Sequence, residues 1–321
     1  MTRKKISIFE MIHSSGIAML RDFFEIDLVC GLDRAGHLEK AKTSDCIIVK
    51  SVVNVDKDFL DNAPKLSVVA RAGTGLDNID VSYAKSIGKQ VLSVPTGNTI
   101  SAAEYTVLFI LMATRRINEV LASVANNDFR RHLLEGRELK SLKVGLIGLG
   151  NVGIEVSRRL KSFGCSQLTY DPFSKNLAEF KEMGGQVCED LDSLCRNSDI
   201  ISLHLALNSQ TRQMVNKNFL SKLKPGTSLI NTARGGLVDE NAILAALDKG
   251  QLELFITDFT YPEPPFDLKP IEHNFNHPFL KHPKVMITPH LGASTIDAQK
   301  RISEDLATQI IGFYESNFNI N

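Results

Sequence analysis

Short apolar runs alternate with amphipathic stretches through the first hundred residues. Four mainly apolar runs predict buried strands, and a weaker run lies at residues 26–29; the four are residues 6–9, 46–49, 67–70 and 90–94. Helical stretches lie between them, for example at residues 16–24 and 57–62. Because strands that alternate with helices form parallel sheets covered by helices, this part of the chain predicts an α/β domain.

The alternation resumes near residue 143 and continues to the end of the chain. Six clear strands are predicted, with a shorter candidate at residues 186–188; the six are residues 144–147, 168–170, 200–205, 228–232, 254–258 and 285–288. Helices are predicted at residues 154–163 and 296–314. Six strands are the number that a complete dinucleotide-binding fold requires.

A connecting segment separates the two halves. Residues 95–98 read Pro-Thr-Gly-Asn, which breaks regular structure and is typical of a hinge. Ser101 and Glu104 fit a capping box at the start of the next helix, which we expect to run to about Arg116. Since this helix is apolar on nearly every side through residues 107–112, it must be buried, either in a domain core or against a partner subunit.

The composition excludes several classes of protein. Lys plus Arg and Asp plus Glu balance at 37 each, so no overall basic field exists that would hold nucleic acid or an anionic membrane. The longest apolar run, residues 107–113, is too short to span a bilayer, and no signal peptide is recognisable. Five cysteines without a Cys-x-x-Cys pair are typical of a reducing cytoplasm. The 321 residues suffice for two domains.

A glycine-rich turn near the middle of the chain carries the first candidate chemistry. Gly148, Gly150 and Gly153 form a G-x-G-x-x-G sequence between a predicted strand and a predicted helix, and Asp171 ends the next strand. The glycines permit a tight turn, close approach of a pyrophosphate and close packing of the helix on the strand. Asp171 would bind the ribose hydroxyls and repel a 2′-phosphate. Because no Arg follows within the next few residues, NAD is favoured over NADP as the cofactor.

Three polar residues follow the ends of later predicted strands, namely Arg234, Glu263 and His290. Each alone is typical of a surface loop or turn, but the carboxyl ends of parallel strands meet at one sheet edge, where ligands bind. Arg234 would bind a carboxylate through two hydrogen bonds and polarise the neighbouring carbonyl. His290 would exchange a hydroxyl proton near neutral pH, and Glu263 would orient the imidazole. Together they predict hydride chemistry on an anionic substrate.

The glycine turn, Asp171 and four further segments, residues 71–80, 231–236, 258–265 and 288–295, give the chain a closer resemblance. It resembles the D-isomer-specific 2-hydroxyacid dehydrogenase family over nearly its whole length. The resemblance implies a Rossmann dinucleotide-binding domain, residues 99–289, inserted into a flavodoxin-like α/β substrate-binding domain made of residues 1–98 and 290–321. It also implies a cleft that closes over the substrate, and a homodimer formed through the helix after Ser101.

The same resemblance implies roles for individual residues. Arg234, Glu263 and His290 would be the catalytic residues of an NAD-dependent dehydrogenase. The implied cofactor contacts are Gly148, Gly150, Asn151, Val152, Gly153, Asp171, His204, Leu205, Ala206, Thr211, Thr232, Ala233, Asp258, His290, Gly292 and Ala293. The implied substrate-binding residues are Lys50, Ser51, Arg71, Gly73, Thr74 and Gly75. The main-chain N–H groups of residues 73–75 would hold the substrate carboxylate.

Arg71 bears on the choice of substrate. In the phosphoglycerate branch of the family, a basic residue here faces the substrate phosphate, and Lys50 ends another strand of the same predicted domain. A phosphate needs such cations, so oxidation of 3-phosphoglycerate to 3-phosphohydroxypyruvate is the preferred reaction. Relatives with other substrates also have this Arg, which leaves reduction of glyoxylate, hydroxypyruvate or another 2-keto acid open. An NADH-sensing corepressor is an alternative of another class, disfavoured by the intact Arg, Glu and His.

Two features depart from the family pattern. Asn151 replaces a basic residue often found in the glycine turn. Residues 266–280 are longer than the usual connection and lie between Glu263 and His290, where they would cap the cleft and change specificity. Three histidines lie within or beside this segment, His273, His277 and His282. Neighbouring Pro and Asn residues disfavour a helix that would align them on a metal ion, so no metal is predicted.

Overall fold

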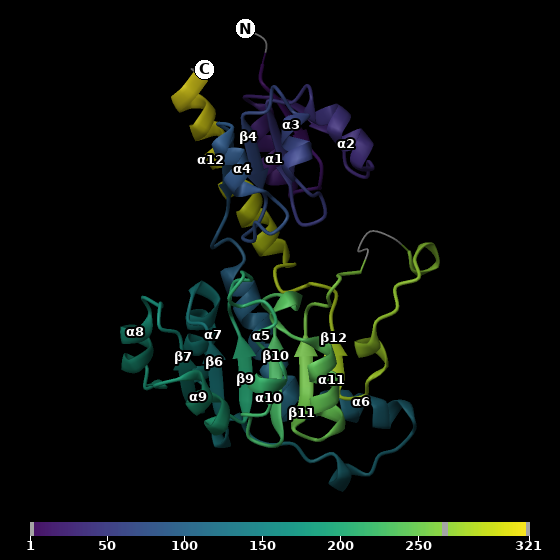
Figure 1. Ribbon diagram of the computed structural model, residues 1–321, viewed down its shortest axis with the longest axis vertical. Coiled ribbons are helices and arrows are strands. Elements are labelled where there is room, and N and C mark those ends of the chain that lie inside the picture. The colour runs from purple at the N-terminus through teal and green to yellow at the C-terminus, as the bar shows by residue number, and fades with distance from the viewer. Residues whose placement is uncertain (1–2, 265–268, 319–321) are drawn as a thin grey trace. The chain divides into compact units, whose positions relative to one another are not determined.

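The computed structural model describes residues 3–264 and 269–318. The chain divides into two compact units, both drawn in Figure 1. Unit 1 comprises Met1–Asn98 and Ala293–Asn321, and unit 2 comprises Thr99–Gly292. Because unit 2 is enclosed in sequence by the two segments of unit 1, its glycine turn falls in the middle of the chain.

Unit 1 is built on a five-stranded parallel sheet in the order β2-β1-β3-β4-β5. This order is that of flavodoxin-like sheets, which confirms the predicted fold of this unit. All five predicted strands are present, including the weak one. The strands are β1 (Lys5–Ile8), β2 (Glu25–Leu28), β3 (Cys46–Val49), β4 (Val68–Arg71) and β5 (Gln90–Ser93).

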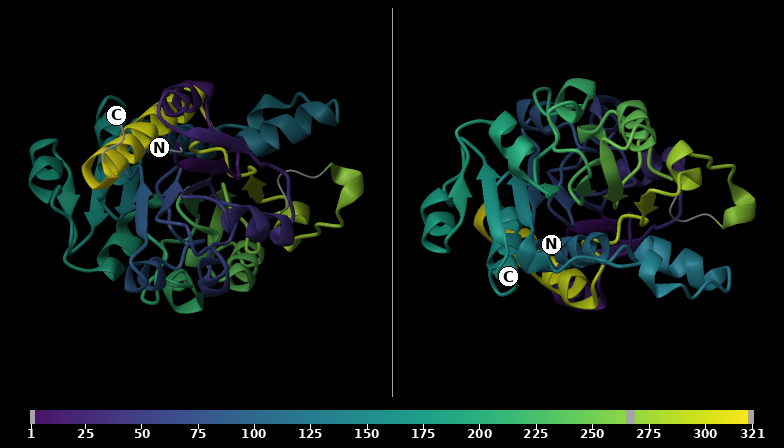
Figure 2. Two further views of the ribbon diagram at one scale, coloured as in Figure 1. Left: turned by 90° about the horizontal axis from the view of Figure 1, so that it is seen from above. Right: turned by 90° about the horizontal axis from the view of Figure 1, so that it is seen from below.

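Helices cover both faces of this sheet because its central strands are apolar on both sides. Helices α1 and α12 pack on one face, where Leu20 and Leu306 are buried against Ile8. Helices α2, α3 and α4 cover the other face, where Phe59 is buried against Val69. Figure 2 shows α12 beside α1, so the last described segment completes unit 1. The helices are α1 (Ser14–Arg21), α2 (Arg34–Ala41), α3 (Lys57–Asp61), α4 (Val81–Ser86) and α12 (Ile296–Phe318).

Unit 2 contains a seven-stranded parallel sheet in the order β12-β11-β10-β9-β6-β7-β8. This is the Rossmann order with one additional strand, and the direction of winding reverses between β6 and β9. The strands are β6 (Lys143–Ile147), β7 (Ser166–Tyr170), β8 (Gln186–Val187), β9 (Ile200–Leu203), β10 (Thr227–Asn231), β11 (Leu252–Thr257) and β12 (Val285–Ile287). Ligands of such sheets bind beyond the carboxyl ends of the strands at this reversal, which is where β6 meets the glycine turn.

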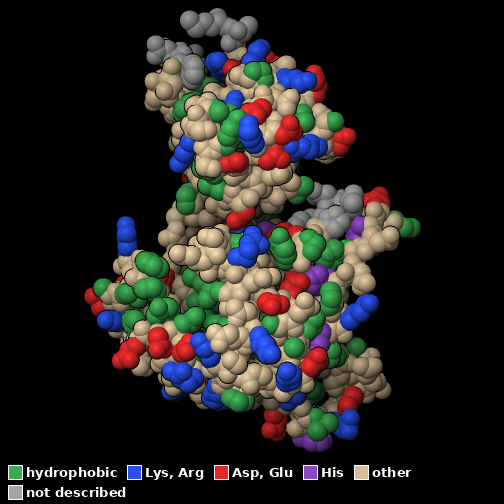
Figure 3. Space-filling model, viewed as in Figure 1, with side chains coloured by type: hydrophobic (Ala, Val, Ile, Leu, Met, Phe, Trp, Pro, Cys, Tyr) green, Lys and Arg blue, Asp and Glu red, His purple; other side chains and the backbone are tan. Residues whose placement is uncertain are grey.

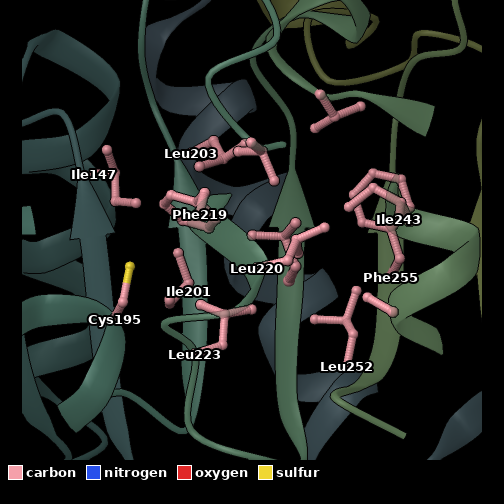
Figure 4. Packing of buried hydrophobic residues seen from close by; sticks show 14 of the residues in the cluster. Ile147, Cys195, Ile201, Leu203, Phe219, Leu220, Leu223, Ile243, Leu252 and Phe255 are labelled. Carbon is pink, nitrogen blue, oxygen red and sulfur yellow. The ribbon is translucent and has the colours of Figure 1, made fainter. Parts of the chain in front are cut away.

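The core of unit 2 lies on both faces of its sheet. Figure 4 shows part of one face, where Leu220 of α10 and Ile243 of α11 lie with Leu203 and Phe255 of the sheet. The opposite face is covered by α5 and α7. The helices are α5 (Thr99–Thr114), α6 (Ile117–Ala125), α7 (Asn151–Lys161), α8 (Leu177–Glu182), α9 (Leu191–Asn197), α10 (Lys217–Leu220) and α11 (Glu240–Asp248). Short 3-10 turns occur at Arg131–Leu133, Leu139–Ser141, Gly235–Leu237, Pro270–Glu272 and Pro278–Lys281.

The predicted capping box at Ser101 is wrong. Helix α5 already begins at Thr99, so Ser101 is an interior residue of the helix and not its cap. Glu104 has a different partner, since its carboxylate lies 3.2 Å from the Arg159 guanidinium of α7. The glutamate therefore links two helices on one face of the sheet.

The second boundary between the units lies before Ala293, not before His290 as expected. The main-chain N–H groups of His290, Leu291 and Gly292 all donate to Asp258, which directly follows β11. These hydrogen bonds keep the three residues in unit 2.

Two helices of unit 2 leave apolar side chains uncovered. In α5, Phe109 and Ile110 are buried but Leu108 is 46% exposed. In α6 no residue is buried, and Leu121 is 62% exposed. Helix α5 therefore has one side in the core of unit 2 and one exposed side, and the exposed side leaves a contact with a partner subunit open.

Charged side chains of both signs are interspersed over the face drawn in Figure 3. This agrees with the balance of 37 basic and 37 acidic residues. Among the helices of residues 3–264 and 269–318, none combines the length and the apolar character that crossing a bilayer requires.

Candidate active site

The glycine turn joins β6 to α7 and has the geometry that a dinucleotide requires. Gly148 has a φ of 92°, which favours glycine. A Cβ atom at Gly153 would lie 2.3 Å from the Gly148 carbonyl oxygen, too close without displacing the main chain. A Cβ atom at Gly150 would meet no other atom within 4 Å. The protein thus leaves the space beside Gly150 open at the amino end of α7, where main-chain N–H groups bind phosphates.

Asp171 follows β7, and its carboxylate is tied to the glycine turn. The N–H groups of Leu149 and Phe173 donate to its two oxygens at 2.8 and 3.0 Å. The Leu149 carbonyl in turn accepts from the side chains of Ser174 and Asn176 at 2.7 and 2.8 Å. Because a carboxylate oxygen accepts more than one hydrogen bond, Asp171 retains acceptors for ribose hydroxyls, while its charge disfavours a 2′-phosphate.

The segment after β9 lies against the glycine turn. The N–H of His204 donates to the Ile147 carbonyl at 2.8 Å. Its Nε2 is buried and has no hydrogen-bond partner in the described part of the chain. Burial lowers the pKa of His204 to about 4, so its ring is neutral. A buried nitrogen without a partner beside this turn fits a bound cofactor that supplies the missing hydrogen bond.

Other predicted cofactor contacts are of three kinds. The side chains of Val152 and Leu205 pack against the two buried clusters of the sheet, so their contacts would come from the main chain. The Thr211 hydroxyl donates to the Ala206 carbonyl at 2.6 Å and thereby shapes the loop after β9. Asn151 is exposed at the first position of α7.

The substitutions Gly153→Ala and Gly150→Ala are a matched test of the glycine turn. We expect Gly153→Ala to cost about 1–3 kcal/mol of unfolding free energy, because its methyl group overlaps the Gly148 carbonyl. We expect Gly150→Ala to leave stability unchanged but to weaken NADH binding at least about tenfold, or ~1.4 kcal/mol. Urea unfolding and NADH fluorescence titration measure the two effects. Equal destabilisation by both substitutions would contradict the geometry.

Arg234 follows β10 on a turn shaped by the buried Asn231. Asn231 Oδ1 accepts from the N–H groups of Ala233 and Arg234 at 3.1 and 3.3 Å, and its Nδ2 donates to the Arg234 carbonyl at 2.9 Å. The Thr232 hydroxyl shares a hydrogen bond of 2.7 Å with Thr106 of α5. The Arg234 guanidinium donates to the Ala233 carbonyl at 2.7 Å. These bonds fix the main chain that carries the guanidinium at the carboxyl end of β10.

Asp258 holds the turn that carries His290. Its carboxylate accepts from the Thr288 hydroxyl at 2.6 Å and from the N–H groups of Leu291 and Gly292 at 2.8 and 2.7 Å. Asp258 is 1% exposed, and this burial raises its pKa. His290 has a φ of 57°, a left-handed conformation that is uncommon outside glycine. Such conformations concentrate at functional sites, because surrounding bonds must hold them in place.

His290 and Glu263 lie in direct contact. The distance from His290 Nδ1 to Glu263 Oε2 is 3.2 Å. Because a carboxylate only accepts, Nδ1 is the nitrogen that carries the proton in this pair. The imidazole also packs on Phe259, with 4.4 Å between ring centroids. The structure thus joins two of the three predicted catalytic residues, and Arg234 lies at the end of β10, which pairs with β11.

In unit 1, Arg71 lies at the carboxyl end of β4, and its Nη1 donates to the Ala72 carbonyl at 2.8 Å. The N–H of Gly73 donates to the Arg71 carbonyl at 2.9 Å, so it is already used within the protein. Among described residues, no acceptor contacts the N–H groups of Thr74 and Gly75. The predicted carboxylate-binding loop therefore offers these two donors and not all three.

The N–H groups of Lys50 and Ser51 are occupied by an acid of the same unit. The Glu10 carboxylate accepts from Lys50 at 2.7 Å, from Ser51 at 3.1 Å, and from the following two N–H groups at 3.0 and 3.1 Å. The Lys50 ammonium donates to Gln299 Oε1 at 3.1 Å. Glu10 thus occupies the main-chain N–H groups of two residues that were predicted to bind the substrate, Lys50 and Ser51.

Glu10 and Asn231 are two polar residues that shape the candidate sites and that were not predicted as site residues from the sequence. Each follows or ends an apolar strand, Glu10 after β1 and Asn231 at the end of β10. A polar side chain in such a position commonly hydrogen-bonds to nearby main-chain groups, so this position in the sequence could have indicated their role.

The histidines of the long connection contact acids of α11 rather than one another. His277 Nε2 lies 2.8 Å from Glu240 Oε2, and His282 Nε2 lies 3.4 Å from Asp248 Oδ1. His273 Nδ1 accepts a main-chain N–H at 3.2 Å. Within the described residues, no group of three or more His, Cys, Asp or Glu side chains is arranged for a metal ion. Part of the predicted cap lies outside the described residues, namely Phe266, Asp267 and Leu268.

A cavity of about 380 Å³ lies at the opposite edge of the unit 2 sheet. Its lining includes Asp199, Ser228 and Lys284, at the amino ends of β9, β10 and β12. None of the predicted catalytic or cofactor residues lines it, so it is separate from the candidate active site.

The fold and the glycine turn of unit 2 define a dinucleotide-binding protein of the doubly wound α/β class. A family model described as D-isomer specific 2-hydroxyacid dehydrogenase, NAD binding domain, matches residues 107–292. The chain belongs to this family. The match falls within unit 2, which confirms the predicted NAD-binding domain and its cofactor.

Individual proteins of known name are also similar to the chain. D-3-phosphoglycerate dehydrogenase of Methanocaldococcus jannaschii is 36% identical over 307 residues, which are 95% of this chain and 56% of that protein. The protein of that name from Mycobacterium tuberculosis is 37% identical over 305 residues, again 95% and 56%. The chain therefore spans little more than half the length of these relatives. The structure of D-lactate dehydrogenase from Aquifex aeolicus, complexed with NAD and lactic acid, is 27% identical with a TM-score of 0.87, covering 98% of this chain and 96% of that one.

Proposed function

We propose that the protein catalyses the NAD-dependent interconversion of a D-2-hydroxy acid and its 2-keto acid. The observation that carries this proposal is the 3.2 Å contact between His290 and Glu263 in the unit that binds NAD. When bound in unit 2, NAD would supply the hydride-transfer chemistry. The side chains of the protein bind the acid and move its hydroxyl proton.

Each catalytic residue has its own role in this proposal. Since Glu263 accepts at His290 Nδ1, His290 Nε2 takes the hydroxyl proton during oxidation and returns it during reduction. Glu263 fixes the tautomer and stabilises the charged imidazolium. Arg234 binds the substrate carboxylate through two hydrogen bonds and polarises the adjacent carbonyl group.

Within this class of reaction, the proposed substrate is 3-phosphoglycerate, and we propose unit 1 as the substrate-binding unit. Relatives named D-3-phosphoglycerate dehydrogenase are 36% and 37% identical to the chain. Arg71 and Lys50 provide cations at the carboxyl ends of neighbouring strands β4 and β3. Because Glu10 occupies the main-chain donors beside Lys50, the phosphate would depend mainly on the Arg71 guanidinium.

A substrate panel with Arg71→Ala tests this assignment. NADH oxidation is measured with 3-phosphohydroxypyruvate, glyoxylate, pyruvate and hydroxypyruvate. We expect the phosphorylated acid to have the highest kcat/KM, and Arg71→Ala to lower that value about a hundredfold, because a hydrogen bond to a charged group is worth ~1.5–3 kcal/mol. Turnover of glyoxylate is expected to stay unchanged in the variant.

Two other outcomes of the panel would redirect the proposal. Equal turnover of the unphosphorylated acids would overturn the phosphate assignment and favour a glyoxylate or hydroxypyruvate reductase. Tight NADH binding without turnover of any acid would overturn the enzymatic proposal and favour an NADH-sensing binding protein.

We also propose that the protein is a homodimer that covers α5 and α6. Leu108 of α5 and Leu121 and Val124 of α6 are exposed apolar residues, and a second copy would remove them from water. The mass in solution, measured by sedimentation equilibrium, tests this proposal, and a monomer would overturn it.

We also propose a reducing, cytoplasmic location for the protein. This proposal is supported by the five cysteines, all of which are free thiols.

A further inference from the structure

Glu240, the first residue of α11, links the segment that precedes the long connection to a histidine within that connection. One of its carboxylate oxygens accepts from the Tyr261 N–H at 2.9 Å, and the other lies 2.8 Å from His277 Nε2. The side chains of His277 and Glu240 are only 6% and 21% exposed. Tyr261 stands two positions before Glu263 in sequence, so this contact holds the main chain that leads into the catalytic glutamate.

We propose that Glu240 and His277 are positioning residues that hold the segment 258–263 so that the Glu263 carboxylate reaches His290. This inference rests on the role of Glu263 in the proposed function. Neither Glu240 nor His277 touches the reacting groups in this account; both act through the main chain at Tyr261.

The hydrogen bonds that connect Tyr261, Glu240, His277 and Phe279 can all form with only one placement of the protons. The Phe279 N–H donates to His277 Nδ1 at 3.2 Å, so Nδ1 is an acceptor and Nε2 carries the proton that is donated to Glu240. At the other end, the Tyr261 N–H is also a donor. With donors at both ends, residue 240 must accept from both neighbours. A carboxylate does this, whereas an amide would leave two donors facing each other somewhere along the chain.

Both ends of this series of hydrogen bonds, at Phe279 and at Tyr261, are held by buried residues. Phe279 is 1% exposed, and its ring lies 5.4 Å from that of Phe255 in β11, so the peptide next to His277 is fixed in the core. At the other end, the buried Thr260 donates from its hydroxyl to the Pro262 carbonyl at 2.8 Å. A Cβ atom at Gly235, the residue after Arg234, would lie 2.6 Å from the Thr260 carbonyl. The segment is therefore packed closely beside the Arg234 turn, and Glu240 fixes its outer end.

The other end of α11 provides a matched control. His282 Nε2 contacts Asp248 Oδ1 at 3.4 Å, and His282 Nδ1 accepts from the Lys284 N–H at 3.1 Å. Like Glu240 and His277, these two residues are an acid of α11 paired with a histidine, but the Asp248 side chain is 73% exposed. Within the described residues, no hydrogen bond or ion pair joins Asp248 or His282 to residues 258–263. Asp248→Asn therefore neutralises a carboxylate that is paired with a histidine, without touching the segment that carries Glu263.

The test compares Glu240→Gln, Asp248→Asn and Glu263→Gln in the full chain, with NADH and either 3-phosphohydroxypyruvate or glyoxylate. Reduction requires a proton on His290, whose Nδ1 lies 3.2 Å from Glu263 Oε2. Asp258, the other acid near the imidazole, is unchanged in all variants. We expect the alkaline fall of kcat to move to lower pH in Glu263→Gln and, in the same direction, in Glu240→Gln. In Glu240→Gln kcat is expected to fall about tenfold with KM nearly unchanged, since general acid–base catalysis contributes ~10²–10⁴-fold and is only partly lost. Asp248→Asn is expected to match the parent protein.

Two results would overturn the inference: a parental pH profile in Glu240→Gln, or an equal shift in Asp248→Asn. If Glu263→Gln itself leaves the pH profile of kcat unchanged, the proposed role of Glu263 is wrong, whatever the role of Glu240. Amide hydrogen exchange of the peptide 258–264 then still decides whether Glu240 holds the segment, since exchange must rise in Glu240→Gln and not in Asp248→Asn. His277→Phe keeps the ring packing on Phe279 and removes the Nε2 proton, so it repeats the test if Glu240→Gln does not fold.

Discussion

His290→Asn is expected to lower kcat for keto-acid reduction about a thousandfold, within the ~10²–10⁴-fold that general acid–base catalysis contributes. The substitution removes the nitrogen that exchanges the substrate proton. Asn is preferable to Gln here because His290 has a φ of 57°, and Asn tolerates this left-handed conformation. The two main-chain hydrogen bonds of the His290 N–H, to Asp258 and Thr288, do not depend on the side chain. NADH affinity is therefore expected to stay unchanged.

The measurement is a pH profile of kcat with the variant beside His282→Asn. His282 precedes β12, whereas His290 follows it, and its partner is Asp248, so its replacement should leave the profile as it is in the parent protein. The His290 variant should lose the alkaline fall of kcat together with the rate. If the His290 variant keeps at least about one tenth of the parental kcat and the parental pH dependence, then another group donates the proton.

The strands of both units could be predicted from the pattern of apolar runs and turn signals, because each central strand is buried on both faces; the two fold types came from the family resemblance. In β10, for example, Leu229 faces one cluster and Ile230 the other, which gives an uninterrupted apolar run. The start of α5 was misplaced because Ser101 and Glu104 have the spacing of a cap, and sequence spacing alone does not show that Glu104 instead pairs with Arg159. Tertiary contacts of this kind override a local signal.

The site was predictable where chemistry depends on residue type at a strand end, as for Arg234, Glu263 and His290. It was less predictable where a carboxylate serves the main chain of the protein. Glu10 occupies the main-chain N–H groups of Lys50 and Ser51, which the resemblance implied as substrate-binding residues, and Glu240 contacts two residues that are 16 positions apart in sequence, Tyr261 and His277. Nothing in the local sequence of an acid shows which N–H groups it will accept from, since these partners become neighbours only in the folded chain.

Arg234→Lys is expected to lower kcat/KM for the keto acid about a thousandfold while NADH binding remains unchanged. Lysine keeps the positive charge but presents a single ammonium, so it cannot form the two parallel hydrogen bonds that a guanidinium makes with a carboxylate. Two hydrogen bonds to a charged group are together worth ~3–6 kcal/mol, and the retained charge recovers part of this. The fold should be preserved, because Asn231 holds this turn through main-chain groups that do not change.

Arg212→Lys is the matched control for this experiment. Arg212 lies over the ring of Tyr261, 5.9 Å from its centroid, and has no assigned part in binding the substrate. Its replacement changes an Arg to a Lys in the same unit, and kcat/KM is expected to stay at the parental value. If Arg234→Lys also stays within about tenfold of the parent, ~1.4 kcal/mol, then Arg234 acts only as a general positive charge. The carboxylate of the substrate would in that case have to be bound by other donors.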